Sequence, residues 1–268
     1  MSDDDRVRAA GKAARMAVPY HKYYRGKMET VPKCAIRSLD DFSIWYSPGV
    51  AAPCEAIKED PELSFAYTNR WNTVAVVSDG SRVLGLGDIG PEAGYPVMEG
   101  KALLYKYLGG VDSVPIMLDT KDPDEIIRTV LLLQPSFGGI NLEDIAQPKC
   151  FRILETLREK ASIPVWHDDQ QGTATVTLAG LLNALELTGR SIESTRIAFV
   201  GSGAANVACA RLIFGRGANP GKCLMVDSKG ILGTHRSDLE RRKNEYYEKW
   251  KLCEQTNDEG REGGIEEA

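Results

Sequence analysis

Short apolar runs alternate with helix-like segments from about residue 40 to residue 187, and this alternation constrains the fold more than any other feature of the sequence. Two of the runs, TVAVVSD and VPIMLD, are typical of buried strands, and each ends in an aspartate. Strand–helix–strand alternation predicts an α/β fold with a parallel sheet covered on both faces. The expected strands are 73–79, 114–119, 138–144 and 163–169, and the expected helices are 122–136, 148–160 and 172–187.

A second unit of the same kind follows. Its expected strands, 196–200 and 222–227, flank the glycine-rich turn GSGAAN and a helix that begins there. This order is typical of a Rossmann-type dinucleotide-binding domain, and only its first two strands are recognisable. We therefore expect a parallel-sheet substrate and metal domain over residues 1–187 and a partial, incomplete nucleotide-binding domain over residues 188–268.

Composition narrows the class of protein. With 33 basic and 38 acidic residues the net charge is −5, which argues against a nucleic-acid partner. The six cysteines include no C-x-x-C pair, which favours reduced thiols in a cytoplasmic protein. No apolar run approaches the roughly 18 residues that a membrane span requires, and the polar start of the chain lacks the apolar core of a signal peptide. We therefore expect a cytoplasmic protein with no membrane partner.

Two pairs of adjacent carboxylates end two of the expected strands. Glu143–Asp144 and Asp168–Asp169 are separated by one crossover helix, so parallel strands would bring both pairs to one edge of the sheet. A divalent cation would offset their mutual repulsion, and Mg²⁺ or Mn²⁺ suits carboxylate ligands. Because neighbouring strand residues point to opposite sides, Asp168 and Asp169 need not share a role. The alternative is that these acids cap helices or face water.

Two stretches approximate the G-x-G-x-x-G fingerprint of dinucleotide sites. GLGDIG, residues 85–90, fits literally, but Pro91 and Pro96 are expected to prevent a helix directly after it. GSGAAN departs at its third glycine yet lies between a strand and a helix, which is the context that the site requires. The expected cofactor-binding residues are Gly201, Ser202, Gly203, Ala204, Ala205, Asn206 and Asp227. Asp227 favours NAD, and Ser228 with Lys229 weakens that preference, so NAD and NADP both stay open.

Six stretches together resemble the malic enzymes, in the order that the family has them: YSPGVA, SDGSRVLGLGDIG, VMEGKALL, NLEDI, HDDQQGTA and VGSGAAN. The resemblance implies oxidative decarboxylation of malate to pyruvate and CO₂, with NAD or NADP and with Mg²⁺ or Mn²⁺. It also implies a homodimer. By position, it assigns Glu143, Asp144 and Asp169 to the metal, Tyr46, Lys101 and Asp168 to catalysis, and Arg82 to the substrate carboxylate.

Elementary chemistry agrees with these residue types. Oxidation of a secondary alcohol needs a base, and Lys101 is expected at the start of an apolar helix, whose positive end would lower the pKa of the amine. Tyr46 is a weak acid that could protonate the enolate formed by decarboxylation. Arg82 offers a planar fork to a carboxylate. Each residue also has a non-functional alternative: Lys101 as a surface lysine, Tyr46 as a core tyrosine and Arg82 as a surface arginine. The division of acid and base roles between Lys101 and Tyr46 stays open.

The sequence departs from the family in its last quarter, which becomes charged and shows no further buried strand. Such a segment is typically a solvated helix or a disordered end. The chain is then either a fragment or split product that needs a separate C-terminal polypeptide as a partner, or a degenerate relative of the family. An uncovered sheet edge predicts poor activity for this chain alone. Two other functions stay open: a malolactic-type decarboxylase that releases lactate, and a non-catalytic subunit that binds malate.

Overall fold

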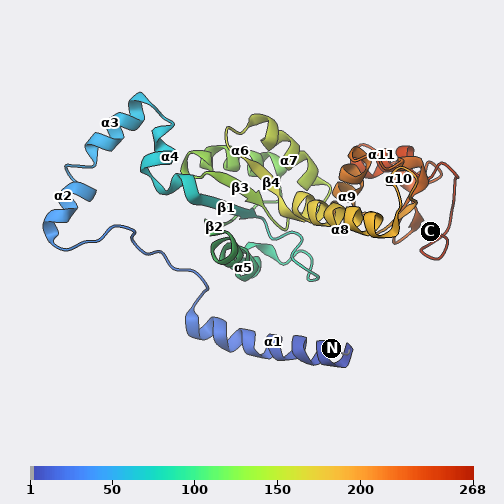
Figure 1. The fold of residues 1–268 in the computed structure, drawn as a ribbon, viewed down its shortest axis with the longest axis horizontal. Helices are drawn as coiled ribbons and strands as arrows, with labels where there is room; N and C mark the ends of the chain where they lie inside the picture. The colour runs from blue at the N-terminus through green and yellow to red at the C-terminus, as the bar shows by residue number, and fades with distance from the viewer. Residues whose placement is uncertain (1–2) are drawn as a thin grey trace.

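The computed structural model describes residues 3–268, and its centre is a four-stranded parallel sheet in the order β2-β1-β3-β4 (Figure 1). This confirms the expected α/β fold and parallel sheet. The strand order reverses between β1 and β3, because the chain first adds β2 on one side of β1 and then adds β3 and β4 on the other. The strands are β1 (Thr73–Ser78), β2 (Asp112–Met117), β3 (Gly139–Leu142) and β4 (Val165–His167).

Helices cover both faces of this sheet. Figure 1 shows α5 on one side and α6 with α7 on the other. Helix α6 begins where the sequence favours it, since the Asp122 carboxylate accepts from the Asp124 amide and Pro123 occupies the first turn. The helices are α5 (Gly90–Gly109), α6 (Pro123–Leu133), α7 (Lys149–Lys160) and α8 (Thr173–Thr188).

A second, three-stranded sheet has the order β5-β6-β7. Strands β5 and β6 are parallel and joined through α9, which is the strand–turn–helix–strand unit that the sequence predicts. Buried apolar side chains form one continuous core from the first sheet through α7, α8 and α9 to this sheet. The elements are β5 (Ile197–Val200), α9 (Ala204–Gly215), β6 (Cys223–Asp227), β7 (Gly230–Ile231), α10 (Ser237–Glu240) and α11 (Tyr247–Gln255).

The charged C-terminal segment is more ordered than its composition predicts. Strand β7 pairs antiparallel with β6 and covers that edge of the sheet. Leu252 and Cys253 of α11 are buried in the core, and Asn257 bonds the carbonyls of Leu232 and Arg261. The expectation of a solvated or disordered end is therefore wrong, because a few apolar and amide groups among the charges suffice to dock the segment.

The N-terminal arm, residues 3–59, extends away from the sheets (Figure 1). It contains α1 (Asp3–Tyr24), α2 (Phe42–Trp45) and α3 (Ala51–Glu59), and α4 (Leu63–Tyr67) joins it to β1. The arm exposes large apolar side chains such as Ile44 and Trp45. Among residues 3–268, no helix is both long enough and apolar enough to cross a bilayer.

Candidate active site

Three carboxylates meet at the carboxyl edge of the first sheet, beside the point where its strand order reverses. Glu143 and Asp144 follow β3 and Asp169 follows β4, and one ligand atom from each lies within 4.8 Å of the others. Ligands of open α/β sheets bind at this kind of position. The sequence predicted that both acid pairs would converge here, and three of the four acids do so.

Backbone contacts hold the loop after β3 in place. Asp144 adopts a φ of +53°, and its amide donates to Oδ2 of Asp169 at 2.9 Å. Its carbonyl accepts from the amide of Arg82 at 3.0 Å. The loop that carries Arg82 after β1 is thus tied directly to the acidic cluster, so the arginine and the carboxylates keep a fixed relation.

Electrostatics at the cluster favour a bound cation. Burial, reinforced by the charge of Asp169, raises the pKa of Glu143 to about 7 and that of Asp144 to about 6. Oδ2 of Asp144 is buried and has no hydrogen-bond partner within the described residues. An unpartnered buried carboxylate oxygen facing two other acids fits a hard divalent cation, and the all-oxygen donor set is the one that Mg²⁺ and Mn²⁺ prefer.

Lys101 connects this cluster to Asp168. Its Nζ lies 2.9 Å from Oε1 of Glu143 and 2.6 Å from Oδ2 of Asp168. Burial disfavours the charge on Lys101, but its two carboxylate partners outweigh burial and raise the pKa of the amine above its ordinary value. The expected lowering by a helix end is wrong, since Lys101 lies in the middle of α5.

Helix α5 begins earlier than expected, at Gly90, the last glycine of the GLGDIG stretch. Pro91 does not prevent this start, because the first turn of a helix needs no backbone donor from that position. Pro96 lies within the helix and removes only one internal hydrogen bond. The helix thus runs past both prolines and carries Lys101 to the acidic cluster.

The two adjacent aspartates have separate partners, as the sequence suggested, but for a different geometric reason. Strand β4 ends at His167, and residues Asp168–Gly172 form a π-helical turn. This turn directs Asp168 to Lys101 and Asp169 to the acidic cluster. Gly172 permits it, because a Cβ there would collide with the Asp168 carboxylate.

A cavity of about 410 Å³, here called the site cavity, opens over the cluster. It is lined by Arg82, the three clustered acids and residues Gly203–Ala205 of the second unit. Tyr46, in contrast, follows α2 in the N-terminal arm, and its side chain is 72% exposed. Within one chain, the structure brings together all expected catalytic and substrate residues except Tyr46.

The glycine-rich turn GSGAAN leads from β5 into α9, which is the position that a dinucleotide-binding turn occupies. Gly201 has a φ of +99°, which favours glycine, and a Cβ added at Gly203 would meet open space at the start of α9. Asn206, the departure from the fingerprint, donates to the carbonyls of Val200 and Gly201 at 2.8 and 3.0 Å. Asn206 therefore fixes the turn. Asp227 ends β6 and is paired with Arg236.

A polar network behind Glu143 was not predicted from the sequence. Asn141 donates to Oε2 of Glu143 at 2.9 Å and accepts from the Tyr105 hydroxyl, which in turn accepts from the Trp166 indole. Asn141 precedes Glu143 by two residues, so alternation along the strand could have placed both on one side. His167 is fully buried, with Nδ1 3.5 Å from Asp169.

Comparisons with known proteins agree with this architecture. Residues 25–158 match the family model of the malic enzyme N-terminal domain, and residues 170–266 match that of the malic enzyme NAD binding domain. The second match contains GSGAAN and not GLGDIG, in agreement with the choice between the two fingerprints. The chain belongs to the malic enzyme family.

Relatives give the same result. The chain is 52% identical over 216 residues to the bifunctional malic/malolactic enzyme of Bacillus subtilis (strain 168), covering 81% of this chain and 52% of the relative. It is 48% identical over 240 residues to the NAD-dependent malic enzyme of Geobacillus stearothermophilus, covering 90% and 48%. The structure of an Entamoeba histolytica malic enzyme superposes with a TM-score of 0.91 at 47% identity, covering 98% and 55%. The chain spans about half the length of these relatives.

Proposed function

We propose that the chain takes part in the metal-dependent oxidative decarboxylation of malate to pyruvate and CO₂, with reduction of NAD or NADP. The observation that carries this proposal is the site cavity, in which clustered carboxylates, Arg82 and the Gly203–Ala205 turn share one space. A hydride transfer needs substrate and nicotinamide side by side, and this cavity borders both a cation site and a nucleotide loop. Relatives named NAD-dependent and NADP-dependent malic enzymes support it.

Each residue has a role that follows from its chemistry. Glu143, Asp144 and Asp169 would hold Mg²⁺ or Mn²⁺, which supplies a Lewis acid to the substrate oxygens when bound. The Arg82 guanidinium receives a substrate carboxylate, with which it can pair through two N–H groups. Lys101 exchanges a proton with the substrate hydroxyl, and Asp168 at 2.6 Å orients and polarises the amine.

Two substitutions with opposite effects test these roles. Asp169→Asn should weaken Mn²⁺ binding at least tenfold, because one charged ligand is lost. Asp168→Asn should leave Mn²⁺ affinity within about twofold and abolish malate-dependent reduction of the cofactor. Mn²⁺ affinity is measured by titration with paramagnetic resonance, and turnover by absorbance at 340 nm. Loss of Mn²⁺ binding in Asp168→Asn, or its retention in Asp169→Asn, would contradict the assignment.

We further propose that the protein is a homodimer and that Tyr46 acts in the site of the second copy. The arm exposes a series of large apolar side chains, which a soluble monomer rarely leaves in water. Helix α5, which carries Lys101, exposes Leu104, Tyr107 and Leu108 on its outer face and provides a matching apolar surface. Between residues 31 and 46, the exposed large apolar residues of the arm are Val31, Ile36, Leu39, Phe42, Ile44, Trp45 and Tyr46.

Sedimentation equilibrium tests this assembly. The protein should sediment as a dimer, and Trp45→Ser with Leu104→Ser should shift it to monomer while Leu132→Ser, an exposed leucine of α6, should not. A monomeric unsubstituted protein would refute the dimer.

All six cysteines are free, which supports a cytoplasmic location.

A second activity, malolactic decarboxylation, is favoured by one observation: the Bacillus subtilis relative is named a bifunctional malic/malolactic enzyme. This reaction uses the same metal and substrate groups but ends in lactate. Measuring lactate, pyruvate and reduced cofactor in one reaction distinguishes the two. Pyruvate equal to reduced cofactor, with no lactate, is the result expected for the proposed function.

A further inference from the structure

A second cavity lies at the end of β6. This basic cavity, of about 450 Å³, shares Gln147 with the site cavity and is lined by Asp227, Ser228 and Lys229. A dinucleotide whose pyrophosphate lies at Gly203–Ala205 would extend its adenosine ribose toward the acid at the end of the second strand. The basic cavity is therefore where the ribose 2′ position would lie, and its charges determine which cofactor it accepts.

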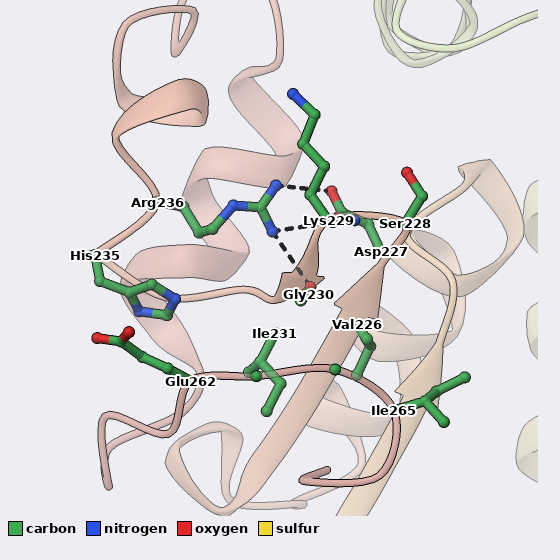
Figure 2. A pocket seen from close by; sticks show the side chains of 12 residues that line it. Val226, Asp227, Ser228, Lys229, Gly230, Ile231, His235, Arg236, Glu262 and Ile265 are labelled. Atoms are coloured by element: carbon green, nitrogen blue, oxygen red, sulfur yellow. Dashed lines mark hydrogen bonds and ion pairs between the residues drawn. The ribbon is translucent and has the colours of Figure 1, made fainter.

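The charge of Asp227 is already neutralised by the protein. Figure 2 shows the Arg236 guanidinium against the Asp227 carboxylate, with Nη1 2.9 Å from Oδ1 and Nη2 3.2 Å from Oδ2. Lys249 of α11 approaches Oδ2 at 3.4 Å, and the Lys229 amide donates to Oδ1 at 2.9 Å. Despite partial burial, these partners hold the pKa of Asp227 below its ordinary value. The carboxylate is thus occupied, and its repulsion of a phosphate is largely offset.

Cationic side chains are in excess around this acid. Besides Asp227 and Asp238, the basic cavity is lined by Lys229, Arg241, Arg242 and Lys249. Arg242 pairs with Glu245 and Lys229 with Asp238, but Arg241 donates to the carbonyl of Ser237 and pairs with no carboxylate in the described part of the chain. The cavity wall therefore carries a positive charge, which a 2′-phosphate would require and a free ribose hydroxyl would not.

From this geometry we infer that the basic cavity binds the 2′-phosphate of NADP, and that Lys249 is the residue that selects it. Lys249 lines the basic cavity and its side chain is 15% exposed, and Asp227 would keep its pair with Arg236 if Lys249 bound a phosphate. This reverses the preference for NAD that Asp227 alone indicates, because the acid is paired with Arg236. The inference rests on the proposed nucleotide site and assigns its cofactor class.

Two nucleotide fragments test the inference without turnover: 2′,5′-ADP, which carries the 2′-phosphate, and 5′-AMP, which does not. By titration calorimetry of the full 268-residue chain, 2′,5′-ADP should bind at least tenfold more tightly than 5′-AMP. Lys249→Ala should weaken 2′,5′-ADP about tenfold and leave 5′-AMP within twofold. Lys251→Ala, which removes an exposed charge from the same helix outside the cavity, is the matched control and should change neither.

Each other outcome overturns the inference. Equal affinity of the two fragments, or equal weakening of both by Lys249→Ala, refutes 2′-phosphate selection while leaving the proposed nucleotide site intact. Binding of neither fragment refutes the nucleotide site and the inference together. Circular dichroism of Lys249→Ala, compared with the unsubstituted chain, excludes a loss of folding as the cause of weaker binding.

Discussion

Replacing Lys149 by methionine should destabilise the protein far more than its surface position on α7 indicates. Lys149 pairs with Asp79, whose side chain is fully buried, while the lysine itself is 18% exposed. Oδ1 of Asp79 accepts from the amide and hydroxyl of Ser81, and the Ser81 hydroxyl accepts from the amide of Ala146. The pair thus supports both loops that form the site, the one with Arg82 and the one with the clustered acids.

The magnitude follows from what the substitution leaves behind. Removing one partner of a buried ion pair costs about 3–5 kcal/mol, because the other charge stays in the interior unpaired. Since Lys149 retains some contact with water, we expect the lower value, about 3 kcal/mol. Arg152→Met is the matched control on the same helix, because its pair with Asp124 is 57% and 69% exposed. An exposed pair contributes only about 0–1 kcal/mol.

Urea denaturation followed by circular dichroism measures both variants. Lys149→Met should lower the urea midpoint by about 1 M, given the slope of about 3 kcal/mol per molar for a chain of this size. In an Asp79→Asn background, Lys149→Met should cost less than about 1 kcal/mol, because no buried charge is left unpaired. Equal losses for Lys149→Met and Arg152→Met, or an unchanged loss in the Asp79→Asn background, would refute the reasoning.

Three further substitutions test other parts of the structure. Gly172→Ala should lower turnover at least tenfold with Mn²⁺ affinity unchanged, since its methyl group displaces the Asp168 carboxylate; equal turnover would contradict this. Asn206→Ala should cost about 1–2 kcal/mol in urea denaturation, because two carbonyls lose a donor, and stability equal to the unsubstituted chain would contradict it. Arg236 holds the pKa of Asp227 below its unfolded value, so this pair stabilises the fold above about pH 5, and its contribution is lost as the pH falls. Arg236→Gln should therefore make the free energy of unfolding fall less steeply as the pH is lowered below about 5. An unchanged dependence of that free energy on pH would contradict this.

Local pattern and topology were enough to predict the core of the first sheet. The run 73–79 is β1 within one residue, and the acids that end β3 and β4 meet because parallel neighbours end at one edge. This convergence of parallel strands at one edge does not depend on the exact residue at which each strand ends. For that reason the metal cluster could be proposed from sequence, although strand 163–169 was expected two residues too long at each end.

Other features depended on interactions that no local pattern records. Asp79 and Lys149 are 70 residues apart, and nothing in either segment predicts their pairing. The start of α5 at Gly90 was not predicted, because Pro91 was expected to prevent a helix there. Proline is tolerated in the first turn of a helix. The order of the C-terminal segment was not predicted, because its high charge indicates a solvated segment. A few apolar side chains, such as Leu252, nevertheless reach the core.

The position of Lys101 explains how adjacent aspartates can coexist at this edge without sharing one cation. Lys101 lies between Glu143, a member of the acidic cluster, and Asp168, which is outside it. The π-helical turn after β4 makes this division possible, because it directs Asp169 toward Asp144 and Asp168 toward the amine. A continued strand would also have separated the two carboxylates, but to opposite faces of the sheet, and only one could then have reached the site. The turn keeps both at the same edge, so a cation site and a proton-transferring lysine can lie next to each other in one cavity.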